Sequence, residues 1–199
     1  YKQYDSLVEY LVRSHTQRRS RWRPPWPRRI IPQRIFVDKR PQVVNLRQVP
    51  GHWETDLICG PGRSALQVLV ERKTRFVLIK KIRNRSAQVS FDALSDLLSK
   101  IKSPLRQSIT YDNGSENALH LYLNRSFHMQ SYFCQPYHSW EKGTVENTNG
   151  LIRRFLKKKT NISTIPASRI QKIQDWLNNR PRKVLNFQTH TDALHQAAC

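Results

Sequence analysis

The chain has 199 residues, with 35 Lys and Arg against 14 Asp and Glu and a formal net charge of +21 at pH 7. This length accommodates one buried domain with flanking arms, but not two full-sized domains. No apolar run reaches the roughly eighteen residues of a membrane helix, and the three cysteines form no C-x-x-C pair typical of a zinc ribbon. The chain starts at Tyr1 without an apolar signal region, so we expect a cytoplasmic protein with no membrane partner, whose natural start lies upstream.

The positive charge is concentrated at the two ends of the chain. Residues 1–50 carry twelve basic and three acidic residues, and residues 151–199 carry ten and two, which leaves thirteen and nine for the middle hundred. A nearly neutral centre between two basic arms is typical of a protein that lies along a nucleic acid. The charge alone fits a ribosomal or anionic-membrane partner as well.

The N-terminal region is predicted to contain a helix over 4–14 and an extended basic linker over 16–50. Prolines within 24–27 exclude the interior of a helix or strand there. Trp22 and Trp26 lie between arginines, an arrangement that can stack on bases and hold phosphates. A solvated linker explains this segment equally well.

Beyond residue 50 the hydrophobic pattern alternates between strands and helices. Strands are predicted over 53–58, 66–71, 76–82, 108–112 and 130–134, and helices over 87–102, 115–125, 143–158 and 166–179. This order predicts an α/β fold with a mixed five-stranded sheet flanked by helices, in which the first hairpin is antiparallel and the later crossovers are parallel. We divide the chain into a basic arm (1–50), a catalytic core (51–162) and a C-terminal helical extension (163–199).

Three carboxylates stand out within or at the ends of predicted elements. Asp56 lies in the first strand, Asp112 ends the fourth and is followed by Asn-Gly, and Glu146 opens the helix 143–158. Two strand acids and a helix acid can converge on a pair of hard divalent cations, which prefer oxygen ligands. Two such ions can clamp the attacking and leaving oxygens of a phosphodiester exchange. A salt bridge would also explain Asp56, and a simple turn would explain Asp112.

Neighbouring residues extend this hypothesis. His52 and Glu54 share the strand face of Asp56 and are candidates to assist it, although such neighbours are more often structural. On the helix, Glu146, Asn149, Arg153 and Lys157 recur along one edge at helical spacing. That edge combines a carboxylate with groups suited to a phosphate backbone; a solvated face is the alternative interpretation.

Several segments resemble those of bacterial insertion-sequence transposases of the DDE class, most of all the insertion sequence 30 group, whose catalytic domain is related to retroviral integrases. The segments are Gly51–Ile58, Val70–Phe76, Tyr111–Gly114 and Pro136–Arg153. The resemblance covers about Ile31 to Gln188. It implies a ribonuclease H-like fold in which Asp56, Asp112 and Glu146 bind two Mg²⁺ ions, with Mn²⁺ as a substitute, and in which Asp56 bridges both ions.

The resemblance also implies a DNA-contacting surface around the acidic triad. Arg153 occupies the position, seven residues after the glutamate, where such enzymes carry a basic DNA contact. To the same surface we assign Lys157, Arg154, Asn149, Lys142 and Trp140. The expected partners are element ends and target DNA, with a homo-oligomer joining two ends. The expected location is the bacterial cytoplasm, in association with the nucleoid.

The sequence therefore predicts the catalytic domain of a DNA transposase that performs metal-dependent strand cleavage and strand transfer. Thr55 and Val145 depart from the family's usual Gly and Asn, which leaves open a degenerate, inactive copy that only binds nucleic acid. A ribonuclease or junction nuclease with the same fold is a further alternative. His190, His195 and Cys199 near the terminus form an incomplete metal set, and a mobile tail is the favoured interpretation.

Overall fold

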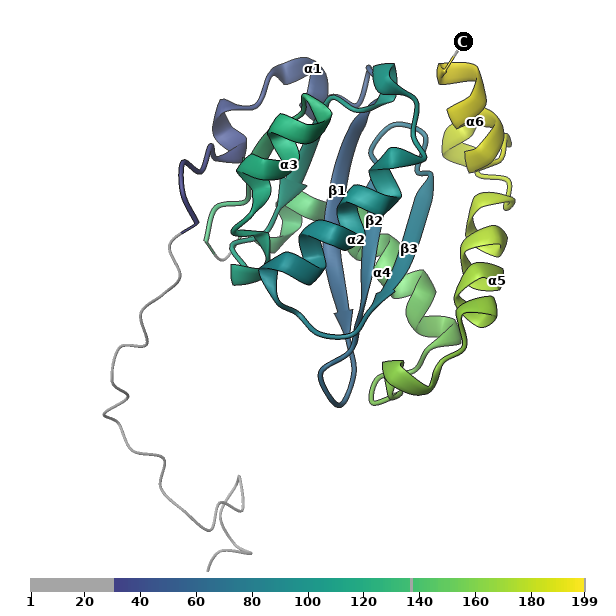
Figure 1. The fold of residues 1–199 in the computed structure, drawn as a ribbon. Coiled ribbons are helices and arrows are strands. Elements are labelled where there is room, and N and C mark those ends of the chain that lie inside the picture. Colours follow the sequence, from purple (N-terminus) through teal and green to yellow (C-terminus); the bar gives the residue numbers. More distant parts are fainter. Residues whose placement is uncertain (1–30, 137, 199) are drawn as a thin grey trace, which may run out of the picture.

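The computed structural model describes residues 31–136 and 138–198. They form a five-stranded sheet in the order β3-β2-β1-β4-β5, with helices on both faces (Figure 1). The strands are β1 His52–Cys59, β2 Ala65–Glu71, β3 Val77–Ile82, β4 Ser108–Tyr111 and β5 Gln130–Phe133. The helices are α1 Gln42–Asn45, α2 Ala87–Ser99, α3 His120–Phe127, α4 Gly143–Phe155, α5 Ala167–Asn178 and α6 His190–Ala197. The helix expected over 4–14 and the two tryptophans that follow it lie outside the described residues.

The strand pairing confirms the mixed sheet expected from the sequence. β1, β2 and β3 pair antiparallel, whereas β1, β4 and β5 pair parallel. The pairing of β1 with β4 extends only from His52 to Glu54, opposite Ser108 to Thr110. Asp56 therefore lies beyond the point where these two strands separate, and its own strand remains paired with β2 at Val68. Ligand sites in such sheets lie outside the carboxyl ends of parallel strands.

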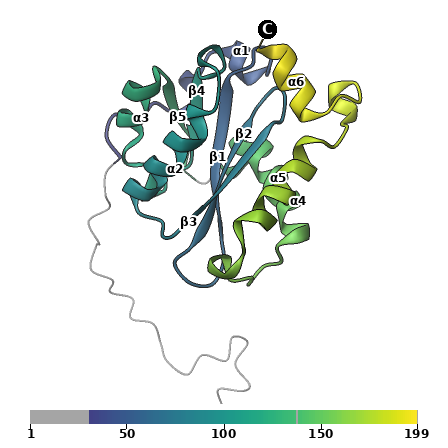
Figure 2. The same ribbon diagram turned by 45° about the vertical axis from the view of Figure 1, so that its right-hand side comes forward.

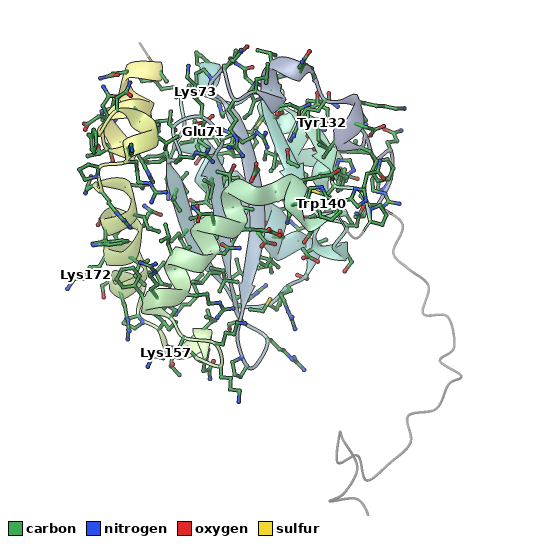
Figure 3. All side chains as sticks on the ribbon, turned by 180° about the vertical axis from the view of Figure 1, so that it is seen from behind. Glu71, Lys73, Tyr132, Trp140, Lys157 and Lys172 are labelled. Atoms are coloured by element: carbon green, nitrogen blue, oxygen red, sulfur yellow. The ribbon has the colours of Figure 1, made fainter. Side chains whose placement is uncertain are left out.

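Both faces of the sheet are covered by helices. Helices α2 and α3 cover one face, and α4 crosses the other, as Figure 2 and Figure 3 show from two sides. Alternation along β2 directs Leu69 into the core on the side of α2, whereas Val68 and Val70 join the core formed with α4 and α5. All seven residues of β2 are buried, as expected of a central strand covered on both faces.

The free edge of β3 is closed by side chains from α5. Asn178 accepts a hydrogen bond from the backbone N–H of Val77 at 2.8 Å and donates one to its carbonyl at 2.8 Å. One turn earlier, Gln174 accepts from the N–H of Ile79 at 2.7 Å. An unpaired edge strand is a template for aggregation. The helix thus replaces the missing neighbouring strand, and it fixes the C-terminal segment to the sheet.

The expected linker is wrong for its described part, because residues 31–50 are folded against the domain. Ile31 and Val44 are buried, and Phe36 forms an isolated parallel bridge with Phe133. Arg40 is also buried and donates to Thr110 on β4 at 2.9 Å. These contacts depend on residues distant in sequence, so local composition did not reveal them.

The C-terminal tail also differs from the prediction. Residues His190–Ala197 form α6, and the helix is capped by Thr189, whose hydroxyl accepts from the N–H of Asp192 at 3.1 Å. Leu194 joins the core beside α2, and His190 is 3% exposed. Among the described residues no three His, Cys, Asp or Glu side chains form a metal-binding group, and Cys199 lies outside that part of the chain. None of the described helices is long and apolar enough to cross a membrane.

Some helix boundaries differ from the prediction. The helix expected over 115–125 is a short 3₁₀ turn, Ser115–Asn117, followed by α3. The helix expected to reach residue 158 ends at Phe155, so Lys157 lies beyond the end of α4 (Figure 3). Helix ends are set by local hydrogen bonding, which hydrophobic spacing determines poorly.

Candidate active site

The ammonium group of Lys142 lies between two of the predicted catalytic carboxylates. Its Nζ is 3.1 Å from Asp56 Oδ1 and 3.5 Å from Asp112 Oδ2, and it donates to the carbonyl of Thr55 at 3.3 Å. The Lys142 side chain is only 5% exposed. Asp56 and Asp112, which are fifty-six residues apart in sequence, are therefore brought together around one shared cation.

Further hydrogen bonds orient both aspartates. Asp56 accepts from the amide of Asn149 on α4 at 2.7 Å. Asp112 accepts from the Asn117 amide at 2.8 Å and from the backbone N–H of Gly114 at 3.1 Å. The Asn-Gly turn after β4 thus holds Asp112 in place, and α4 restrains Asp56. No arginine forms an ion pair with either aspartate among the described residues.

Glu146 lies in the first turn of α4 and is exposed. It is four residues after Lys142 and three before Asn149, and both of these side chains contact Asp56. Helical spacing therefore puts Glu146 on the stripe of α4 that faces the aspartates. The three acids do not form a closed ligand group in the described part of the chain, so the structure brings Asp56 and Asp112 together around Lys142 but does not bring Glu146 into the same group.

The charges at the site are strongly coupled. Burial alone would lower the pKa of Lys142. The negative charges of Asp112 and Asp56 have the larger combined effect, so the pKa of Lys142 lies above its ordinary value. A fourth carboxyl, Glu116, has its pKa raised, first by burial and further by the nearby Asp112. Its carboxylate packs directly over the α-carbon of Gly114. Glu116 was not predicted from the sequence, although its place four residues after Asp112, beyond a turn, was a signal.

Glu54 anchors the start of α4 and is completely buried. One of its oxygens pairs with Arg72, and the other accepts from the backbone N–H groups of Thr144 and Val145 at 3.0 and 2.9 Å. The interpretation of Glu54 as structural therefore matches its contacts. Because α4 carries Glu146, this buried carboxylate also positions the helix side of the site.

His52 and Thr55 likewise have structural partners. The His52 ring is 2.8 Å from the Ser108 hydroxyl, and burial, with Arg72 and Arg40 nearby, lowers the pKa of His52 to about 4. The Thr55 hydroxyl donates to the Val68 carbonyl at 2.9 Å. The departure from the family pattern at Thr55 is thus accommodated by a satisfied hydrogen bond.

The predicted DNA-contacting residues have different surroundings. Arg153 donates to the Cys59 carbonyl at 2.6 Å, and Arg154 and Lys157 are exposed. Trp140 is 67% exposed and stacks on His138 with ring centroids 4.4 Å apart. In Figure 3, Trp140 and Lys157 mark opposite ends of α4 along the back of the sheet. An exposed aromatic ring and basic groups along one helix suit a nucleic-acid strand.

The donor set fits hard divalent cations. Asp56 and Asp112 already share a positively charged group, the Lys142 ammonium, which occupies the position of a cation held by both. All the predicted ligand atoms are carboxylate oxygens, which Mg²⁺ and Mn²⁺ prefer. Asp56, Asp112 and Glu146 are the side chains that would hold such ions.

Comparisons with known proteins show which proteins this chain resembles. An integrase core domain model matches residues 46–139. The chain is 41% identical over 191 residues to the transposase for insertion sequence element IS1086 of Cupriavidus metallidurans, a match that covers 96% of this chain and 56% of the relative. The chain is similar to insertion-sequence transposases over nearly all of its length, and residues 46–139 match an integrase core. It is also 35% identical to Transposase InsI for insertion sequence element IS30A of Escherichia coli, over 95% of this chain and 50% of that protein.

Solved structures confirm the ribonuclease H-like fold of this transposase homologue. The catalytic core domain of BIV integrase aligns with a TM-score of 0.58 at 15% identity, over 74% of this chain and 95% of the integrase chain. A chain of the simian T-cell lymphotropic virus intasome complex aligns with a TM-score of 0.60 at 17% identity, over 74% and 55%. The chain spans about half the length of the curated relatives it matches.

Proposed function

We propose that this chain is the catalytic core of a DNA transposase that cleaves DNA strands and transfers them to a new site with the aid of divalent metal ions. The observation that carries this proposal is the meeting of Asp56 and Asp112 around one buried cation, next to the first turn of the helix that carries Glu146. The similarity to insertion-sequence transposases and the net charge of +21 support DNA as the substrate.

The proposed ligands are Asp56, Asp112 and Glu146, and the proposed cofactor is a pair of Mg²⁺ ions, for which Mn²⁺ substitutes. When bound, such ions supply an activated oxygen nucleophile and stabilise the departing 3′ oxygen. The chain's own groups position the substrate. Asn149 and the Asn117 amide hold the aspartates in register, and the exposed Trp140, Arg154 and Lys157 offer contacts to the phosphate backbone and bases.

We expect the active form to be a homo-oligomer on DNA, because two element ends must be joined to one target. The same reasoning places the protein with bacterial DNA in the cytoplasm. The intasome neighbour supports this expectation only through the shared fold.

The direct test is strand cleavage and strand transfer on duplexes that carry the terminal inverted repeats flanking the coding sequence, with Mg²⁺ or Mn²⁺. Asp112→Asn keeps the shape of the side chain and removes its charge, so we expect activity to fall by at least about 100-fold while DNA binding persists. Equal activity in the two proteins would refute the assignment. An inactive wild type that still binds DNA would support the degenerate alternative, and a preference for RNA–DNA hybrids or branched DNA would favour a nuclease.

A further inference from the structure

A pocket lined by both polar and apolar side chains lies beside α4. It has a volume of about 380 Å³, within the range of ligand sites. Thr144 and Asn147 of α4 form one wall. The other walls include Arg47, Arg75, Arg182 and His190, of which the last two come from one C-terminal segment and the first two from distant parts of the sequence.

The pocket is lined by positive charge and by no acid, although Glu54 and Glu71 lie near enough to Arg75 to offset part of that charge. Three of its lining residues are arginines, and none is Asp or Glu. None of the three forms an ion pair within 4.0 Å among the described residues, although Arg75 donates to the Thr144 hydroxyl at 3.0 Å. Burial, and then the neighbouring Arg47, lower the pKa of Arg75. Bringing like charges together in a partly buried site is unfavourable unless an anion neutralises them.

Buried polar groups in the pocket also lack partners. His190 is only 3% exposed, and neither of its ring nitrogens has a hydrogen-bond partner in the described structure. The same holds for Nε of Arg47. Buried polar atoms are nearly always hydrogen-bonded, and each exception calls for an explanation. A ligand with several acceptor oxygens would satisfy the arginines and one ring N–H at once.

We propose that Arg47, Arg75, Arg182 and His190 form a binding site for a phosphodiester group of the DNA backbone, distinct from the acidic site. This inference rests on the proposed function. The pocket reaches Asn147, the residue next to Glu146, so one DNA strand can pass from the acidic site over the first turns of α4 into the pocket. Guanidinium groups suit this ligand because their planar donors match phosphate oxygens.

The affinity of the chain for a 20-base-pair duplex, measured by fluorescence anisotropy over a series of salt concentrations, tests the proposal. Arg182→Gln removes one charge from a half-buried side chain that makes no side-chain hydrogen bond in the described structure. Loss of one phosphate contact reduces the salt slope by about one and weakens binding about 8-fold at 0.1 M salt. Arg125→Gln on α3, at the opposite face of the sheet, is the matched control and should change neither quantity.

A direct readout is the side-chain NMR spectrum of His190. We expect its ring signals to shift when duplex DNA is added, whereas those of the exposed His128, the residue after α3, stay unchanged. Inorganic phosphate, added as a separate probe, should shift the same His190 signals at a higher concentration. Thermal melts of each variant establish that it remains folded.

Two results would overturn the proposal. The first is that Arg182→Gln has the same DNA affinity and salt slope as Arg125→Gln. The second is that the His190 signals respond to inorganic phosphate but not to DNA. Either result leaves the proposed function intact if the wild type still cleaves DNA and Asp112→Asn does not. Failure of the proposed function itself would instead appear as wild-type protein without metal-dependent cleavage.

Discussion

The buried pair of Glu54 and Arg72 provides the sharpest test of how the site is held together. Glu54 is completely buried, Arg72 is 4% exposed, and the same carboxylate accepts two N–H groups from the first turn of α4. Replacing Glu54 by Gln keeps the volume and one acceptor oxygen for the helix. It leaves the Arg72 guanidinium buried without a counter-ion.

The expected cost follows from that geometry. Removing one member of a buried ion pair costs about 3–5 kcal/mol, because the remaining charge is uncompensated. Glu54→Gln retains hydrogen bonding to α4, so we expect the lower end, about 3 kcal/mol. For a chain of this size each kcal/mol lowers Tm by about 2–4 °C, which gives a decrease of about 6–12 °C.

Urea unfolding of the wild type, Glu54→Gln and the double variant Glu54→Gln/Arg72→Met measures this cost. The double variant should recover part of the loss, because the unpaired charge is gone. Asp92→Asn, an exposed acid on α2, is the matched control and should change stability by less than about 0.5 kcal/mol. If Glu54→Gln lies within about 1 kcal/mol of the wild type, the buried pair does not anchor α4 and the reasoning is wrong.

Other predictions follow from the same contacts. Lys142→Met removes the cation that the two aspartates share, so Mn²⁺ affinity measured by calorimetry should rise about ten-fold, or about 1.4 kcal/mol; unchanged affinity would contradict the shared-cation geometry. The pKa values of His52 and His190 are lowered from 6.5 to about 4, by burial above all. As the pH falls, these two histidines are therefore protonated in the unfolded chain before they are protonated in the folded one. Their full contribution to the free energy of unfolding is present above pH 6.5, and it should fall as the pH decreases towards 4, by up to about 1.4 kcal/mol per pH unit for each histidine. His190→Gln should make the slope shallower, and equal slopes in urea titrations would argue against a buried neutral ring. Asn178→Ala uncaps the edge of β3 and should cost about 3 kcal/mol in urea unfolding, whereas the exposed Gln171→Ala should cost less than about 0.5 kcal/mol; similar costs would show that α5 does not protect the edge.

Regular patterns of apolar and strand-forming residues along the sequence made most of the sheet predictable. β2 was found because Leu66–Glu71 is an unbroken strand-forming run between turn residues, and the resemblance to insertion-sequence transposases supplied the fold. Parts stabilised by distant contacts were missed. Residues 31–50 carry scattered apolar side chains whose partners, such as Phe133, lie about a hundred residues away, and no local pattern records such pairing.

The helix α6 could have been predicted. Thr189 followed by Asp192 is a capping sequence, and in the structure the two side chains are 2.6 Å apart. Composition near a chain end favoured a mobile tail instead. At the site, Asp56 and Asp112 were correctly expected to meet, but the ammonium of Lys142 between them was assigned to DNA. The position of Lys142 one turn before Glu146 is compatible with a contact to DNA and with a contact to the aspartates. Only the packing of α4 on β1 distinguishes these two roles.

The separation of β1 from β4 after Glu54 has a mechanical consequence. Asp56 is fixed by its ladder with β2, whereas Asp112 follows the last residue of β4 and sits on a turn. The gap between these two carboxylates can therefore widen or narrow without breaking any sheet hydrogen bond. Swapping the lysine ammonium for a cation of another radius costs only small rearrangements of a turn, while the rest of the sheet remains rigid.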